Sequence, residues 1–271
     1  KDYVYLLGDF NDWKVQTNYM LNRHFVNSDS VIWWIDLTVS PGTEYAFQYL
    51  VDGTIRTGDP YSEKILDPGN DQYIPSTNYP NLKPYPAGKT SQVVSVLQTA
   101  QSEYQWQVTD FQRPPKERLF IYELHVRDFS TQRNYQFLID TLSYLKSLGV
   151  NAIELMPVNE FEGNSSWGYN PSFSTALDKY YGTPNKLKEF IDLCHQNGIA
   201  VIMDIVLNHA YGQSPLVRMY WDSANSRPAA NSPWFNVVSP NPVYSWGFDF
   251  NHEKSGTKYF VDRVNRYWLE E

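Results

Sequence analysis

The stretch Ile199–Val206, with the sequence IAVIMDIV, decides the fold of this chain. It is an almost continuous apolar run, which is typical of a strand buried on both faces of a parallel sheet. Two similar runs precede it, at Leu119–Val126 and Ala152–Val158. Because segments with helical spacing separate the runs, the alternation predicts an α/β domain over residues 118–271.

Three helices are predicted between and after these strands. The first has leucines at helical spacing and ends before Gly149, and the second begins at Thr183-Pro184, an N-cap followed by proline. The third begins near Phe260. Three βα units fit either a doubly wound open sheet or part of a (β/α)8 TIM barrel, and a complete barrel needs about 250 residues. If the domain is a barrel, it is therefore incomplete.

The first 117 residues follow a different pattern, so a multi-domain chain is predicted. Residues 1–75 contain short β-type segments separated by turns, with a hairpin signal at Asp52-Gly53, and predict a small immunoglobulin-like β-sandwich. Residues 76–117 are rich in proline and predict a surface connector with some order around Val93–Leu97. Within the α/β domain, residues 210–256 form an excursion that is too long for an ordinary βα loop.

Composition restricts the classes of partner. The net charge of −8 argues against nucleic acid, and no run reaches the ~18 apolar residues of a membrane span. Cys194 is the single cysteine, which excludes an internal disulfide framework. Nine Trp, 21 Tyr and 14 Phe either form an aromatic β core or leave rings that can stack on sugars. A strand pattern starts at the first residues, so we expect a trimmed N-terminus and predict no compartment.

Candidate site residues follow the second and third predicted strands. Trp167 and Tyr169 follow the second strand, Asp204 lies near the end of the third, and Asn208 and His209 come after it. Functional residues of parallel α/β folds lie at such strand ends. An aromatic ring fixes the plane of a sugar, and an imidazole beside it can donate to a hydroxyl group. Each residue also has a structural alternative, such as a hydrogen-bonded carboxylate, a loop anchor or packing between loops.

In these segments the chain resembles the alpha-amylase family, glycoside hydrolase family 13. The resemblance is carried by Ile121–Phe129 (IYELHVRDF), Met156-Pro157 with Trp167–Pro171 (WGYNP), and Asp204–His209 (DIVLNH). These segments are most similar to the branching, debranching and pullulanase-like members. Upstream, Leu7–Trp13 (LGDFNDW), Val51–Gly53 and Asp59-Pro60 resemble a family 48 carbohydrate-binding module. The matches follow in the family's order over nearly the whole chain.

The resemblance implies a role for each site residue and an alpha-glucan as the substrate. His209 would hydrogen-bond the sugar on the non-reducing side of the cleaved bond, and Tyr169 would stack under the same sugar. Asp204 would orient the polar network of the site. Asn208 matches a calcium ligand of many amylases, although no other calcium ligand can be identified. No other cofactor is implied.

The catalytic carboxylates of the family are not matched in this chain. Retaining hydrolysis needs two carboxylates about 5–5.5 Å apart. In the family they follow the fourth and fifth strands, so we expect them beyond Glu271 and expect the chain itself to be inactive. Glu123 and Glu154 lie within predicted strands, and neither they nor Glu160 has an evident acid partner.

The module-like segment also departs from the family pattern. Trp13 matches one sugar-stacking position, while Ile55 and Gln48 occupy positions where binding modules have a ring and a cation. We therefore expect a docking role, with at most a weak glucan contact at Trp13.

Two other functional interpretations of the sequence stay open. A non-catalytic glucan-binding or scaffold protein would have the same motifs, and a metal-dependent barrel hydrolase would require a His-x-His pair where His125 stands alone. The sequence does not separate alpha-1,4 cleavage, alpha-1,6 cleavage and branching. An incomplete barrel also predicts self-association through its open face, or closure of that face by residues 210–256.

Overall fold

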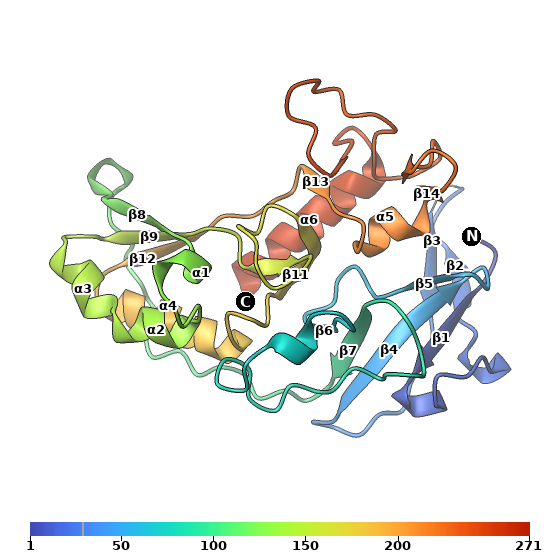
Figure 1. The fold of residues 1–271 in the computed structure, drawn as a ribbon, viewed down its shortest axis with the longest axis horizontal. Helices are drawn as coiled ribbons and strands as arrows, with labels where there is room; N and C mark the ends of the chain where they lie inside the picture. The colour runs from blue at the N-terminus through green and yellow to red at the C-terminus, as the bar shows by residue number, and fades with distance from the viewer. Residues whose placement is uncertain (29) are drawn as a thin grey trace.

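The computed structural model describes residues 1–28 and 30–271, and its first part is an antiparallel sheet (Figure 1). The five strands are β1 (Val4–Gly8), β4 (Glu44–Val51), β5 (Ile55–Thr57), β6 (Ile65–Leu66) and β7 (Val94–Gln98). Their order is β1-β4-β7-β6, with β5 paired to β4. The hairpin predicted at Asp52-Gly53 is confirmed, because both residues have positive φ and the turn joins β4 to β5.

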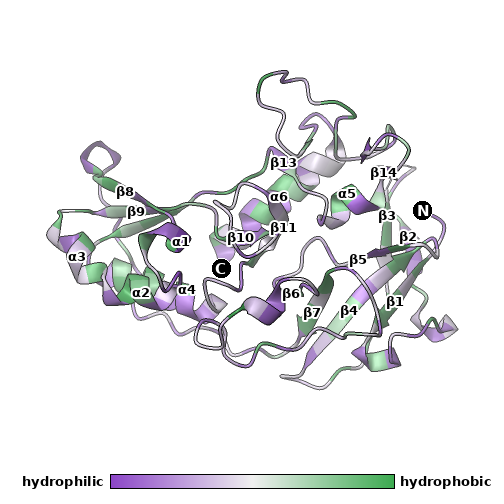
Figure 2. Cartoon of the chain, in the orientation of Figure 1, coloured by the Kyte–Doolittle hydropathy of each residue, from purple (hydrophilic) through white to green (hydrophobic). Residues whose placement is uncertain are grey.

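Both faces of this sheet are covered by apolar side chains. The hairpin formed by β2 (Asn22–Phe25) and β3 (Val31–Trp34) contributes Trp33 to a cluster with Val4 and Leu6 on one face. On the other face, Leu7, Ala46, Leu66 and Val94 belong to a second cluster. Figure 2 shows the hydrophobic colouring on β1 and β7, the strands that supply part of these clusters.

The predicted boundary of the first domain at residue 75 is too early. Strand β7 falls in the segment predicted as connector, yet it pairs with both β4 and β6. The sequence predicted order around Val93–Leu97, but the prolines on both sides of this segment led to its assignment to the connector. A later part of the connector contacts helix α4 (Pro184–Gln196): the Asp192 carboxylate accepts hydrogen bonds from the backbone of Gln107 and Val108, at 2.9 and 3.0 Å.

The three predicted parallel strands are confirmed. They are β8 (Ile121–Leu124), β9 (Ala152–Leu155) and β12 (Ala200–Met203), in the order β12-β9-β8. The predicted first helix is divided into α2 (Tyr135–Asp140) and α3 (Leu142–Ser147) at Thr141, whose hydroxyl donates to the Phe137 carbonyl at 2.7 Å. Helix α4 begins after the predicted N-cap, Thr183, whose side chain accepts from the Lys186 amide.

The excursion at residues 210–256 has its own small core. Within the excursion or overlapping its ends are β13 (His209–Ala210), α5 (Pro215–Met219), β14 (Trp221–Asp222), β15 (Arg227–Pro228), β16 (Phe248–Asp249) and α6 (Ser255–Glu270). Two strands precede it in the chain, β10 (Asn159–Phe161) and β11 (Pro171–Leu177). Phe235 and Phe250 of the excursion stack at 4.5 Å, and Phe260 of α6 packs on Phe250 at 5.3 Å. The excursion is therefore an ordered part of the fold.

The remaining elements are single turns: α1 (Val126–Phe129) and the 3-10 helices Asp9–Asn11, Thr17–Tyr19, Asp71–Tyr73 and Lys116–Arg118. None of the helices described at residues 1–28 and 30–271 is long and apolar enough to cross a membrane.

A buried ionic cluster joins the two parts of the chain. The Lys179 ammonium pairs with the Glu160 carboxylate and lies 3.3 Å from Asp71, which belongs to the first part. Nearby, the Thr175 hydroxyl donates to the Ser62 carbonyl at 2.9 Å. Buried charges and hydrogen bonds therefore hold the N-terminal sheet against the α/β domain.

Candidate functional site

The loop between β9 and β11 is fixed around Gly168. Its φ is +89°, and a Cβ atom there would lie 2.5 Å from the Pro157 carbonyl oxygen, so only glycine fits. The Gly168 amide donates to the Ser166 hydroxyl at 3.0 Å, and the Asn170 amide donates to the Glu162 carbonyl at 3.0 Å. These contacts determine the positions of the two aromatic residues on either side of the glycine.

The structure brings together three of the predicted site residues. The Tyr169 hydroxyl donates to Asp204 Oδ2 at 2.6 Å. His209 Nε2 lies 2.8 Å from the Tyr169 carbonyl oxygen, a distance at which the ring nitrogen donates. The Tyr169 side chain is 39% exposed, whereas His209 is only 8% exposed. Tyr169 therefore presents its ring to solvent while its hydroxyl and backbone are both held.

This arrangement modifies the role expected of His209. Its Nε2 atom is engaged by the backbone of Tyr169, so the nitrogen left for a substrate hydroxyl is Nδ1. In the neutral imidazole, donation from Nε2 leaves Nδ1 as an acceptor. His209 thus positions Tyr169 directly, and any sugar contact would be through the other nitrogen.

Acidic groups surround the Tyr169 hydroxyl. Burial raises the pKa of Tyr169, and the hydrogen bond to Asp204 and the charges of Asp204, Glu123 and Glu154 raise it further. The phenol therefore stays protonated and remains a donor. Glu123 and Glu154 are neighbours in the register of β8 and β9, a relation that was not predicted from the sequence.

The other two residues predicted in the α/β domain lie on the surface. Trp167 is 59% exposed, so its ring is open to a ligand. Asn208 is exposed, and its carbonyl oxygen accepts from the Phe250 amide at 2.9 Å. No group of three His, Cys, Asp or Glu residues suited to a metal ion is found in the described chain. Asn208 lies on the surface, and its role as a calcium ligand stays a prediction.

The structure overturns the glucan contact expected at Trp13. The side chain is 5% exposed, and its Nε1 atom donates to Asp9 Oδ1 at 3.1 Å. Leu82 and Tyr85 of the proline-rich segment pack against the same cluster. Gln48 is also buried, with its amide donating to the carbonyls of Ser91 and Val93. Neither Trp13 nor Gln48 is available to a sugar.

The excursion folds back and contacts the site, which was not predicted from the sequence. Gly247 has a φ of +61°, and a Cβ atom there would lie 2.9 Å from His209 Cδ2 and 2.8 Å from the Ala210 carbonyl oxygen. The pairing of β13 with β16 explains this approach. Exposed rings at Tyr244 and Trp246 precede the glycine. The aromatic residues within 234–250 were the sequence feature that could have indicated this contact.

A second polar group follows β8, at a strand end that the sequence analysis noted without assigning a role to its residues. His125 Nδ1 lies 2.9 Å from Asp128 Oδ2, and Arg127 Nε donates to the other Asp128 oxygen at 2.8 Å. The hydrogen bond from Arg127, followed by that from His125, lowers the pKa of Asp128. The position of these residues at the end of the first strand was the signal for them.

Known proteins share this architecture. Residues 128–270 match the family model described as alpha amylase, catalytic domain. A malto-oligosyltrehalose trehalohydrolase of Saccharolobus solfataricus is 30% identical over 222 residues, which cover 80% of this chain and 35% of that protein. A 1,4-alpha-glucan branching enzyme GlgB of Vibrio cholerae is 30% identical over 282 residues, which cover 98% of this chain and 34% of that enzyme.

A solved structure supports the same relationship. The crystal structure of a protein provisionally described as an alpha amylase, from Salmonella typhimurium, superposes with a TM-score of 0.71 at 26% identity. The match covers 100% of this chain and 38% of that one. The chain thus spans about a third of the length of the relatives that it matches, 34% and 35% in the two cases above.

Proposed function

The chain belongs to the alpha-amylase family, and on that premise we propose that it forms the N-terminal part of a retaining glycoside hydrolase or transglycosylase acting on alpha-glucans. Its α/β domain is a TIM-barrel-type catalytic region. The names of the relatives, a trehalohydrolase and a glucan branching enzyme, support an alpha-glucan as the substrate class.

The arrangement of Tyr169, Asp204 and His209 carries this proposal. A tyrosine ring that is exposed on its face and held at its hydroxyl can stack on a sugar with little loss of side-chain entropy. Asp204 uses Oδ2 for Tyr169, so Oδ1 can accept from a sugar hydroxyl. The three residues together form a binding subsite.

The catalytic acid and nucleophile are proposed to lie outside residues 1–271. Glu123 and Glu154 are side by side, but both lie within strands and not past their ends. We expect the isolated polypeptide 1–271 to release no reducing sugar from starch, pullulan or glycogen. In the protein made from the complete reading frame, Glu123→Gln and Glu154→Gln should retain turnover. Abolition of turnover by either variant, in a folded protein, would place the chemistry at these residues instead.

The N-terminal sheet is proposed to be a β-sandwich module that docks onto the barrel and does not bind glucan through Trp13. The burial of Trp13 and Gln48 supports the docking role. Contacts such as Asn78 Nδ2 with the Tyr180 carbonyl at 2.7 Å support it as well. In calorimetry, residues 1–99 alone should not bind maltoheptaose, and micromolar binding by a folded module would contradict this role.

A direct test of the proposed function uses Tyr169→Phe in the protein made from the complete reading frame. The variant keeps the ring but loses the hydrogen bond to Asp204, so kcat/KM on amylose should fall by several-fold, about 1 kcal/mol. Tyr144→Phe, at an exposed ring of α3, is the control. If the wild-type protein binds glucans without turnover, the scaffold alternative replaces the enzyme proposal.

A further inference from the structure

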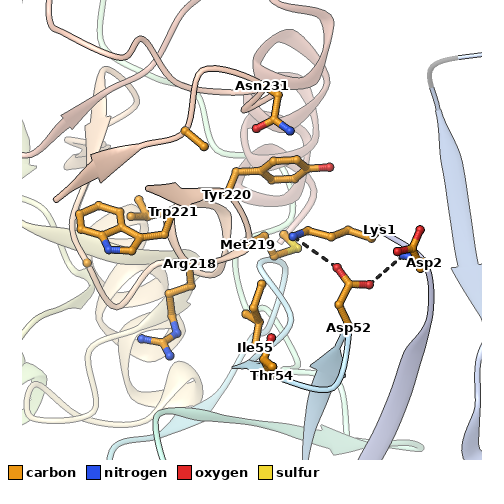
Figure 3. Close-up of a pocket in the computed structure, with 13 residues that line it drawn as sticks. Lys1, Asp2, Asp52, Thr54, Ile55, Arg218, Met219, Tyr220, Trp221 and Asn231 are labelled. Carbon is orange, nitrogen blue, oxygen red and sulfur yellow. Dashed lines mark hydrogen bonds and ion pairs between the residues drawn. The ribbon is translucent and has the colours of Figure 1, made fainter. Parts of the chain in front are cut away.

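A pocket separate from the Tyr169 subsite lies between the N-terminal sheet and the excursion (Figure 3). Its volume is about 710 Å³, within the usual range for small-molecule sites. The excursion contributes Arg218, Tyr220, Trp221 and Asn231, and the β4–β5 turn contributes Thr54 and Ile55. In Figure 3 the two aromatic side chains lie on the excursion side, with Ile55 and Thr54 below them.

The two rings of this pocket are held by edge contacts. Trp221 meets the Phe248 ring at 5.1 Å with an interplanar angle of 78°, and Tyr220 meets Trp234 at 5.6 Å and 73°. Trp221 is still 39% exposed. A ring that is fixed at its edge and open to solvent suits stacking on the flat apolar face of a sugar.

The polar groups of the pocket suit a neutral ligand with many hydroxyl groups. Arg218 is anchored by donation from Nε to the Arg56 carbonyl at 3.2 Å, which leaves the terminal nitrogens of its guanidinium as donors. Asn231 is exposed and offers both a donor and an acceptor. The Lys1 ammonium lies 3.5 Å from Asp52 Oδ2, so these two charges offset each other within the pocket.

From these observations we propose that the pocket is an accessory site for a segment of an alpha-linked glucan chain, with Trp221 as the stacking platform. The inference rests on the proposed function and specifies its substrate as a long chain. Trp221 packs on Phe248 of β16, and β16 pairs with β13, which carries His209. The excursion therefore supports both sites, so that one long glucan can be held at two places.

The test uses the protein made from the complete reading frame and two pocket variants, Trp221→Ala and Asn231→Ala. Trp34→Ala is the matched control, because that tryptophan is 45% exposed on β3 and does not line the pocket. Binding of maltoheptaose is measured by calorimetry in a Tyr169→Ala background, which weakens the first subsite. KM is then measured for amylose and for maltotriose with Tyr169 intact.

We expect Trp221→Ala to weaken the remaining binding event by about tenfold, the loss of one stacking contact, and Trp34→Ala to leave it unchanged. Trp221→Ala should also raise KM for amylose more than KM for maltotriose. Asn231→Ala should weaken the same binding event by several-fold. If Trp221→Ala does not fold, the result for Asn231→Ala tests the accessory site instead. Unchanged binding and KM in a folded variant, with wild-type turnover intact, would overturn the accessory site alone. Absence of glucan turnover in the wild type would overturn the proposed function.

Discussion

Single residues determine whether the subsite can form, and Gly168 is the clearest case. Replacing it with alanine would place Cβ 2.5 Å from the Pro157 carbonyl oxygen, in a backbone with a φ of +89°. Gly163→Ala is a matched control, since Gly163 has the same φ of +89° and no atom within 4 Å of its Cβ position. Both variants carry the backbone strain of a positive φ, about 1–3 kcal/mol, and only Gly168→Ala adds the collision with Pro157. The difference between their free energies of unfolding therefore measures the collision.

We therefore expect Gly168→Ala to lower the free energy of unfolding by more than Gly163→Ala does, and to lower kcat/KM as well, because Tyr169 follows the glycine directly. Urea denaturation and steady-state kinetics provide the two measurements. Equal losses in both variants would show that the collision is relieved without cost.

The residues of the subsite could be predicted because they lie at strand ends that are recognisable from sequence. Tyr169, Asp204 and His209 follow strands that read as apolar runs in the sequence, and the structure joins the three residues by two hydrogen bonds. The burial of Trp13 could not be predicted, because other members of its cluster, such as Ala46, Leu66 and Val94, lie far along the chain. The approach of residues 246–249 to His209 depends on an antiparallel pairing with no local signal.

At the scale of elements, local signals were reliable where a capping residue or a long apolar run was present. The N-cap of α4 and the three parallel strands were predicted for this reason. Strand β7 was missed as a part of the first sheet, because its pairing partners are distant in sequence and prolines flank it.

The N-cap of α4 provides a prediction at this scale. Thr183→Ala removes the oxygen that accepts from the Lys186 amide at 3.3 Å, and should lower the free energy of unfolding by about 1 kcal/mol. Thr183→Ser keeps an oxygen and should stay within a few tenths of a kcal/mol of wild type. Denaturant titrations compare the three proteins. Equal losses for alanine and serine would mean that the side-chain oxygen contributes no stability.

At the scale of the whole molecule, the buried cluster between its two parts makes stability depend on pH. Lys179 is a single ammonium group beside the carboxyl groups of Glu160, Asp71 and Asp178. Burial raises the pKa of Glu160 and that of Asp178, although Lys179 opposes both shifts. The folded chain therefore binds protons that the unfolded chain releases above its ordinary carboxyl pKa values of 4.5 and 3.8.

The sign of the effect follows from this proton uptake. Because the native state binds more protons, the free energy of unfolding should decrease as pH rises above these ordinary carboxyl pKa values. Glu160→Gln, whose amide oxygen can still accept from Lys179, should reduce this dependence, and Glu103→Gln at an exposed position should not. Urea denaturation at several pH values gives the slopes. A stability that rises across this window would contradict the account.

The open edges of the parallel sheet affect the assembled state. Within the described residues, β8 and β12 each pair only with β9 and have a free edge. Phe120 and Ile121 are exposed at β8, and exposed edges with apolar side chains favour pairing with another chain. For the polypeptide 1–271, light scattering should therefore detect association. A strictly monomeric polypeptide with protected β8 and β12 amides would contradict this prediction.

The most direct test of the central claim, that Tyr169, Asp204 and His209 form a glucan subsite, is kcat/KM on amylose for Tyr169→Ala and His209→Ala. The measurement uses the protein made from the complete reading frame, with Tyr73→Ala as the control at an exposed ring. We expect each site variant to lose about tenfold or more, with His209→Ala also losing about 1 kcal/mol of stability, because a buried imidazole and its hydrogen bond to Tyr169 are removed. The control should match wild type. If both site variants keep wild-type kinetics, the subsite is assigned to the wrong residues.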